Sequence, residues 1–262
     1  MRLRLYLNIF LFNASVFRAY PLEALAVLLK RLIEVGFLFA FWSVVARSSN
    51  GAIDFRSLVV YFLVTIAVNQ IVMATVLRLA QQLRGLVKRG EISNYFIRPL
   101  PVIPAIYASY LGSSIPFLAL AGIGFVVALI LQPPHGLFGI IAFLVFLALA
   151  MMISLAFNLL VGAWAFSFNE INSIRHSLSH IIQVFSGAMV PLSYFPGTLR
   201  HALLLSPFPG MVYGPAAALR YSSLSGEVLK AFGVNAVWAA VLLTVAVLIW
   251  NRTIRHYEAV GI

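Results

Sequence analysis

Few side chains in this sequence have the types and spacing that catalysis or metal binding requires. His176 and His180 are four residues apart, as two metal ligands on neighbouring helix turns would be. Glu170 is the nearest acidic residue, but it lies beyond a turn, and the chain contains no cysteine. Two histidines at a membrane interface explain the pair more simply. We therefore expect no metal site and no cofactor bound by this chain.

Two kinds of active site match the sequence poorly. Ser186 and His201 are the candidates for a serine protease within the membrane, but VFSGAM lacks the glycine two positions before the serine. The phosphate-binding loop G-x-x-x-x-G-K-[ST] is absent, so the chain does not carry the usual motif for ATP hydrolysis. We expect no catalytic residue, and a protein that is not itself an enzyme.

Uncharged polar residues inside long apolar segments are a stronger clue. The uncharged polar residues within the spans are Asn69, Gln70, Ser154 and Asn158. Asn69, Gln70 and Asn158 either line a translocation pathway or form hydrogen bonds between helices. A chain of buried carboxylates, which an ion-driven carrier needs at the membrane midplane, is missing from the sequence. Glu34 is expected to pair with Arg31, about one helical turn away.

The amino-acid composition indicates the environment in which these side chains lie. Of 262 residues, 62% are hydrophobic and 10% are charged, whereas a soluble domain has about 45–50% apolar and about 25% charged residues. The sequence therefore predicts a membrane protein. The net charge of +11 does not indicate nucleic-acid binding, because most Lys and Arg residues fall between hydrophobic segments rather than in one patch.

The expected fold is an all-α polytopic membrane protein, 1–262, forming a single transmembrane domain. A transmembrane helix needs about 20 mostly apolar residues. Pro191 and Pro196 limit the fifth of the six segments that meet this length. The predicted spans are 25–46, 58–80, 102–131, 137–166, 178–195 and 229–250.

The positive charges predict the orientation of these spans. One side carries thirteen Lys and Arg residues and the other carries Arg47, Arg56, Arg200, Arg220 and Lys230. Because positive residues concentrate on the cytoplasmic side, both termini and the loop 81–101 are predicted to be cytoplasmic. The thirteen are Arg2, Arg4, Arg18, Lys30, Arg31, Arg78, Arg84, Lys88, Arg89, Arg98, Arg175, Arg252 and Arg255.

Three further segments have their own patterns. Residues 1–20 place Arg4, Asn8, Ser15 and Arg18 on one helical face, which favours an interfacial helix over a cleaved signal peptide. The prolines and glycines of 191–227 favour a re-entrant hairpin or short helices in the outer leaflet over one continuous span. In the third span, Pro104 and Pro116 predict kinks, and a stripe of small residues predicts close helix packing. This stripe consists of Ala105, Ala108, Gly112, Ala119 and Gly122.

The segment LVKRGEISNYFIRPLP, residues 86–101, is the most polar part of the chain's middle. Residues 83–98 are compatible with a short amphipathic helix that Pro99 ends. Lys88, Arg89, Glu91 and Arg98 would then face a partner protein. The alternative is an ordinary positively charged cytoplasmic loop. If the bundle transports a substrate, the energy must come from another protein, because the chain has neither an ATPase motif nor buried carboxylates for ion coupling. This requirement favours the docking surface over the ordinary loop.

The whole chain resembles the ABC-type-2 permeases, the membrane subunits of bacterial ABC exporters. The resemblance rests on the N-terminal helix, the six spans and three motifs in order. These are KRGEISNYFIRPLP, FSGAMVPLSYFPGTLRHALLLSPFPGMVYGP and the terminal RHYEAVGI.

The resemblance implies that the loop after the second span is a coupling helix held by a separate ATPase subunit, which binds ATP and Mg. A smaller second contact would involve Glu170 and Arg175, and the 191–227 segment would cap the exit as outward re-entrant helices. The coupling residues would be Lys88, Arg89, Gly90, Glu91, Tyr95, Arg98 and Pro99.

The function that this resemblance implies is export across the bacterial plasma membrane. Two permeases, identical or paralogous, and two ATPases would form the transporter, surrounded by membrane lipids. Few charges and 21 Phe with 10 Tyr favour a hydrophobic or amphipathic substrate. The alternative is a membrane-embedded enzyme or scaffold that acts on lipids without ATP, although no polar catalytic cluster supports it.

Overall fold

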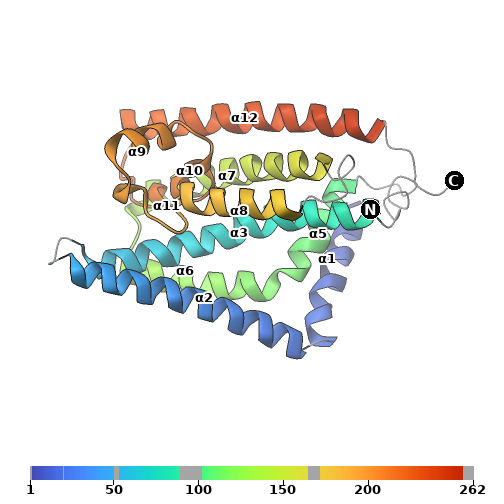
Figure 1. The fold of residues 1–262 in the computed structure, drawn as a ribbon, viewed down its shortest axis with the longest axis horizontal. Coiled ribbons are helices and arrows are strands. Elements are labelled where there is room, and N and C mark those ends of the chain that lie inside the picture. The colour runs from blue at the N-terminus through green and yellow to red at the C-terminus, as the bar shows by residue number, and fades with distance from the viewer. Residues whose placement is uncertain (1, 20, 50–52, 89–101, 165–171, 256–262) are drawn as a thin grey trace.

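The structure, a computed structural model, describes residues 2–19, 21–49, 53–88, 102–164 and 172–255. All elements in these ranges are helical (Figure 1). They are α1 (Arg2–Ala19), α2 (Pro21–Ser48), α3 (Phe55–Lys88), α5 (Val102–Ser113), α6 (Ile115–Leu131), α7 (Gly136–Trp164), α8 (Asn172–Phe185), the 3₁₀ helix η1 (Leu192–Tyr194), α9 (Gly197–Leu204), α10 (Phe208–Met211), α11 (Tyr213–Ala218) and α12 (Gly226–Arg255).

Within these described ranges, three helices are long and apolar enough to cross a membrane. They contain the apolar stretches Phe55–Val72 in α3, Gly136–Ala163 in α7 and Gly226–Thr253 in α12. A helix satisfies its own backbone hydrogen bonds, which is the condition for crossing hydrocarbon. The predicted second, fourth and sixth spans are thus confirmed by length and composition.

The other three predicted spans differ in detail from the helices that are present. The segment 25–46 lies within α2, and 102–131 is divided into α5 and α6 at Ser114, next to Pro116. The predicted fifth span is wrong in its extent, because α8 begins at Asn172 and ends at Phe185 rather than continuing to residue 195. Its 14 residues extend about 21 Å, less than the hydrocarbon core of about 30 Å.

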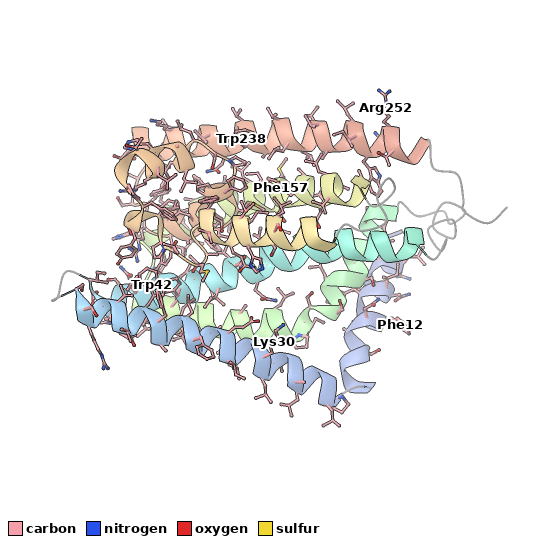
Figure 2. The ribbon with its side chains drawn as sticks, viewed as in Figure 1. Phe12, Lys30, Trp42, Phe157, Trp238 and Arg252 are labelled. Carbon is pink, nitrogen blue, oxygen red and sulfur yellow. The ribbon has the colours of Figure 1, made fainter. Side chains whose placement is uncertain are left out.

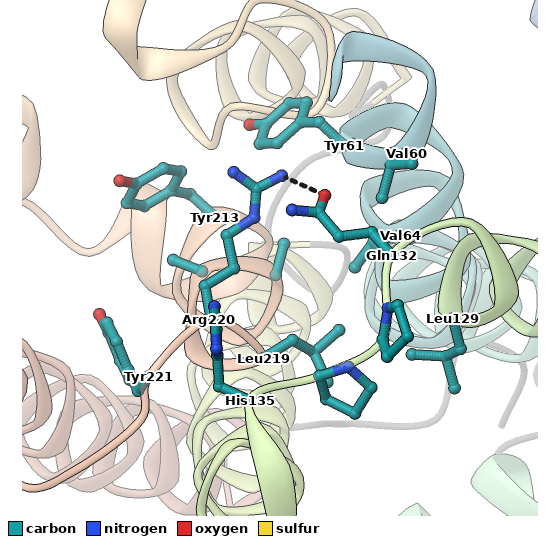
Figure 3. Close-up of a pocket in the computed structure, with 14 residues that line it drawn as sticks. Val60, Tyr61, Val64, Leu129, Gln132, His135, Tyr213, Leu219, Arg220 and Tyr221 are labelled. Atoms are coloured by element: carbon teal, nitrogen blue, oxygen red, sulfur yellow. Dashed lines mark hydrogen bonds between the residues drawn. The ribbon is translucent and has the colours of Figure 1, made fainter. Parts of the chain in front are cut away.

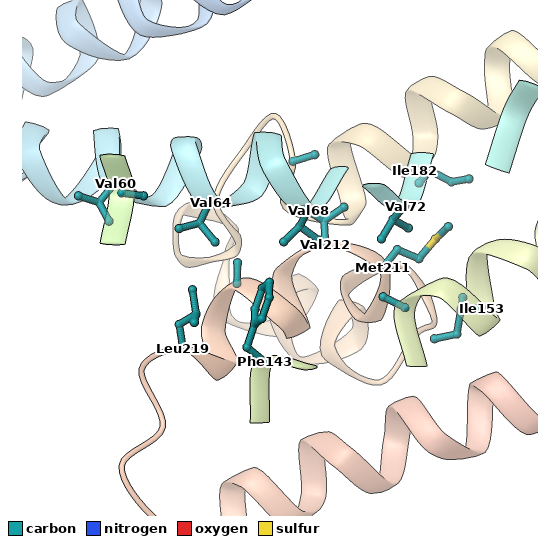
Figure 4. Packing of buried hydrophobic residues seen from close by; sticks show 14 of the residues in the cluster. Val60, Val64, Val68, Val72, Phe143, Ile153, Ile182, Met211, Val212 and Leu219 are labelled. Atoms are coloured by element: carbon teal, nitrogen blue, oxygen red, sulfur yellow. The ribbon is translucent and has the colours of Figure 1, made fainter. Parts of the chain in front are cut away.

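The core lies between α3, α7 and the short helices α10 and α11. Val60, Val64, Val68 and Val72 are four residues apart, so they share one face of α3. Figure 4 shows this face directed toward α7 and toward the α10–α11 region. Short helices are thus present within 191–227, and α10 and α11 contribute to the buried core, whereas α9 is largely exposed. The buried cluster that contains the four valines of α3 also includes Phe143, Ile153, Met211, Val212 and Leu219.

Helices α2 and α12 lie at opposite sides of the bundle in Figure 1, and both expose large apolar side chains. On α12, Ala239 and Ala246 are buried, whereas Val237 and Leu248 are exposed. On α2, Phe37 is 74% exposed. In water such surfaces would be costly, and in a bilayer they face lipid.

The predicted N-terminal helix is present as α1, which packs against α5. Gly112 of α5 lies against the backbone of Phe10 and the side chain of Asn13, so a larger residue would not fit there. The small-residue stripe does not continue this role, because no described atom lies within 4 Å of a Cβ built on Gly122. Among the glycines of the stripe, close packing is thus confirmed at Gly112 and not at Gly122, and Ala105 is buried as well.

The bundle has two distinct ends (Figure 1). Helices α3 and α12 both run from the end that contains α9–α11 to the end where α1 begins. The start of α1 and the last described turn of α12 therefore lie at the same end of the molecule. We call the opposite end, formed by α9–α11 and the connection 132–135, the short-helix end.

Candidate functional site

Most predicted coupling residues lie outside the described residues. These are Arg89, Gly90, Glu91, Tyr95, Arg98, Pro99 and Glu170. Lys88 is the last residue of α3 and Arg175 lies in the first turn of α8, but the description does not include their side chains. Both residues belong to the half of the bundle away from the short-helix end (Figure 1). Their contact with a partner stays a prediction.

Asn69, a predicted pathway residue, lines a cavity of about 350 Å³ between α2, α3 and α8. Glu34 of α2 and Gln183 of α8 contribute the other polar side chains of its wall. The Asn69 Oδ1 atom is buried and, among the described residues, has no hydrogen-bond partner. A buried acceptor without a partner is costly, so this cavity is suited to a donor group or water.

Gln70 lines a different cavity, of about 200 Å³, between α2, α3 and α6. Its wall is otherwise apolar and includes Leu63 and Gly124. Val35 of α2 and Ile66 of α3 line both this cavity and the one at Asn69. The two predicted pathway residues therefore face separate spaces on either side of the contact between α2 and α3.

Asn158, the third predicted pathway residue, is buried in α7 and lines neither of these two cavities. Its Nδ2 donates to Ser154 O one turn earlier at 3.1 Å. The Ser154 hydroxyl donates to Val72 O of α3 at 2.9 Å, which links the two helices. The Asn158 Oδ1 atom, like that of Asn69, is buried without a hydrogen-bond partner among the described residues, and its role in a pathway or in packing stays a prediction.

Glu34 forms an ion pair with Lys30, where Nζ and Oε1 are 3.9 Å apart. The pairing of Glu34 with Arg31 stays a prediction, since the Arg31 side chain lies outside the described residues. The spacing of four residues places Lys30 on the face of α2 that Glu34 occupies. The side chains of Lys30 and Glu34 are 77% and 48% exposed, so the pair contributes little to stability.

The motif FSGAMVPL turns the chain out of α8 and is held by α2 and α3. Tyr61 donates its hydroxyl hydrogen to Gly187 O at 2.6 Å, and Trp42 Nε1 donates to Met189 O at 3.3 Å. Gly187 has a φ of +84°, in the left-handed region that favours glycine. The Ser186 hydroxyl is buried without a hydrogen-bond partner among the described residues, while His201 Nδ1 lies 2.9 Å from Gly197 O on exposed α9.

The motif SPFPGM is held by α12. Gly210 lies directly against the Asn235 side chain, leaving no room for a Cβ. Trp238 Nε1 donates to Leu205 O at 2.8 Å, just before the motif (Figure 2 labels Trp238 on α12). The glycines and prolines of both motifs therefore have structural roles in attaching the short helices to the long ones.

A third cavity, of about 300 Å³, opens at the short-helix end (Figure 3). Arg220 Nη2 donates to Gln132 Oε1 at 3.2 Å across it. The sequence had suggested none of its polar residues as functional, although QPPH and ALRY mark two of its edges. The polar lining consists of Tyr61, Gln132, His135, Tyr213, Arg220 and Tyr221.

Comparison with known proteins gives one match. A model of the ABC-2 family transporter proteins matches residues 32–261, from α2 to the C-terminal residues. Comparison with curated proteins and with solved structures found no match to the chain. The match covers α2 to α12 and both motifs that attach the short helices. The chain therefore belongs to the ABC-2 family of transporter proteins.

Proposed function

We propose that this protein is the permease subunit of an ATP-driven exporter in the bacterial plasma membrane. Family membership supports the permease role. The sequence lacks a phosphate-binding loop, so a separate ABC ATPase supplies the energy. A second permease, the same or a paralogous chain, completes the channel, and both termini face the cytoplasm with the short-helix end outward.

The observation that carries the proposal is the pair of cavities beside α2. A helix that is packed closely along its length cannot move without breaking many contacts. Between α2 and α3, by contrast, a cavity lies on each side of Val35 and Ile66. Asn69 and Gln183 make one cavity polar within an otherwise apolar bundle. Such a lining suits an amphipathic cargo that has a hydrogen-bonding group.

The coupling step is assigned to the segment from Lys88 to Pro99, with Glu170 and Arg175 as a second contact. ATP binding closes the ATPase dimer and displaces these segments, and α3 transmits the displacement because it extends from Lys88 to the cavities. The bistable element in this mechanism is the contact between α2 and α3.

The test is co-expression with candidate ABC ATPases from the same organism. Glu91→Ala and Arg98→Ala are expected to lose co-purification of the ATPase or its stimulated ATP hydrolysis, while membrane insertion stays normal. Arg200→Ala, an exposed arginine on α9 at the other end, is the matched control and should behave as wild type. Normal assembly and normal ATP hydrolysis in both loop variants would exclude the coupling assignment.

A further inference from the structure

The cavity at the short-helix end combines a cation, several hydroxyl groups and an apolar floor. Arg220 carries the positive charge, and Tyr61, Tyr213 and Tyr221 contribute the hydroxyl groups. Val60, Val64 and Leu129 form part of the apolar wall. Figure 3 shows the Arg220 guanidinium pointing toward Tyr61 and Gln132.

The charge of Arg220 is not neutralised by an acidic residue of this cavity. Among the described residues that line it there is no Asp or Glu, and the hydrogen-bond partner of Arg220 is the neutral amide of Gln132. Glu227 of α12 acts electrostatically on Tyr221 but is not part of the lining. Guanidinium groups bind phosphate through two parallel hydrogen bonds, which this partner leaves room for.

The Tyr221 hydroxyl lines the cavity as a hydrogen-bond donor. Burial, followed by the proximity of Tyr213 and Glu227, raises the pKa of Tyr221, so this hydroxyl stays protonated. The Tyr61 hydroxyl hydrogen is already donated to Gly187 O, and His135 lies on the same rim, in the connection between α6 and α7. An anion in the cavity would thus meet the fixed positive charge of Arg220 and the Tyr221 hydroxyl.

The cavity lies at the level of the bundle where a lipid headgroup is expected. Its wall comes from the first turns of the apolar stretch of α3, from the end of α6 and from the connection before α7. Tyr and Arg are typical of the boundary between hydrocarbon and water. The apolar floor continues toward the bundle core, through Val60 and Val64.

We propose that this cavity binds the phosphate headgroup of one anionic phospholipid, with Arg220 as the phosphate ligand and the apolar floor in contact with the upper part of an acyl chain. The site is separate from the cavities beside α2. The inference goes beyond the proposed function, since it requires neither an ATPase nor a cargo. Its failure would leave the exporter assignment unchanged.

The test is native mass spectrometry of the purified full-length protein, titrated with phosphatidylglycerol or phosphatidylcholine. Wild type is expected to bind one phosphatidylglycerol in preference to phosphatidylcholine. Arg220→Gln should weaken that affinity about tenfold, because a charge-assisted hydrogen bond is lost. Arg200→Gln, at an exposed position on α9 outside the cavity, should bind as wild type does.

Two further arms separate the alternatives. Gln132→Ala releases the guanidinium and should bind phosphatidylglycerol at least as tightly as wild type, whereas a loss equal to that of Arg220→Gln would show a merely structural role and overturn the proposal. Excess glycerol phosphate should not displace the lipid. Displacement would assign the site to free anions instead, and equal binding of both lipids would overturn the headgroup selectivity.

Discussion

Gly210 shows how tightly single residues attach the short helices. A Cβ on Gly210 would collide with the Asn235 side chain, which is itself fixed by a 2.8 Å hydrogen bond from Nδ2 to Ala231 O. Gly187 is fixed in a similar way, since a Cβ there would lie 2.8 Å from the Tyr61 hydroxyl. These glycines fall in the motifs FSGAMVPL and SPFPGM, so the motifs are explained by packing.

We expect Gly210→Ala to lower the stability of the protein by about 1–3 kcal/mol, as overpacking a core typically does. The measurement is the thermal unfolding midpoint of the purified protein in detergent. Combining it with Asn235→Ala should recover part of the loss, because the second substitution removes the colliding amide. Gly233→Ala is the control, since no described atom lies within 4 Å of a Cβ there. Equal midpoints for Gly210→Ala and Gly233→Ala would contradict this account.

Asp54 predicts a pH dependence at the start of α3. Its carboxylate accepts hydrogen bonds from Arg56 N and Ser57 N, both at 3.1 Å, and from Ser57 Oγ at 2.6 Å. The Ser57 side chain, followed by these backbone N–H groups, lowers the Asp54 pKa below its ordinary value of 3.8. A lowered pKa contributes stability above the ordinary value, and this contribution disappears as the pH falls through the folded-state pKa.

Asp54→Asn isolates this contribution, because the amide retains the shape and loses the charge. The unfolding midpoint of wild type should exceed that of Asp54→Asn near neutral pH, and the difference should shrink as the pH falls below 3.8 and vanish below the folded-state pKa. Ser57→Ala should reduce the same difference, since it removes the largest cause of the shift. A wild-type advantage that stays constant down to the lowest pH would show that the carboxylate charge is not responsible.

At the scale of elements, the contact between α2 and α3 carries the functional argument. Val68 is fully buried on α3, whereas its neighbours Asn69 and Gln70 each line a cavity under α2. The alternation arises because 100° per residue turns successive side chains of α3 from the core toward α2. Since the natural sequence lacks cysteine, single thiols can be introduced without other changes.

We expect Asn69→Cys and Gln70→Cys to react with a small water-soluble thiol reagent, because both positions line a cavity. Val68→Cys should remain unreactive in the folded protein, and it serves as the matched control. The measurement is the labelled fraction after a fixed time, before and after unfolding in detergent. Labelling of Val68→Cys at the same rate as the other two would contradict the described packing.

The sequence predicts best those helices that depend only on residues close together in the chain. Helices α3, α7 and α12 follow from continuous apolar segments, so their existence required no knowledge of the fold. The end of α8 at Phe185 depends on Tyr61 and Trp42, which contact the chain from 126 and 147 residues away. The predicted span continued to residue 195 because the prediction used apolar composition alone, which contains no information about those two contacts.

The candidate site was predictable to a similar degree. Asn69 and Gln70 are recognisable as polar residues within an apolar segment, but the cavity that each faces depends on the position of α2. Asn158 has the same sequence signature, but it is buried in α7, donates to Ser154 O of its own helix and lines neither of these cavities. The Arg220 cavity needs three distant segments to meet, so no local pattern indicated its function.

At the scale of the whole molecule, the two ends of the bundle should lie on opposite sides of the membrane. We expect a membrane-impermeant thiol reagent to label Ser223→Cys, in the exposed loop at the short-helix end, in intact cells. Asn251→Cys, exposed near the end of α12, should be labelled only after the cells are opened. The reverse pattern would invert the orientation that the positive residues predict.

The central claim is that ATP bound by another subunit changes the shape of this one. The direct measurement is the thiol-labelling rate of Asn69→Cys in the complex with its ABC ATPase, with and without ATP in the presence of vanadate. The account predicts a rate change of about tenfold or more in the complex, from a redistribution between two states, and no change for the permease alone. An identical rate with and without ATP in an assembled, ATP-hydrolysing complex would contradict it.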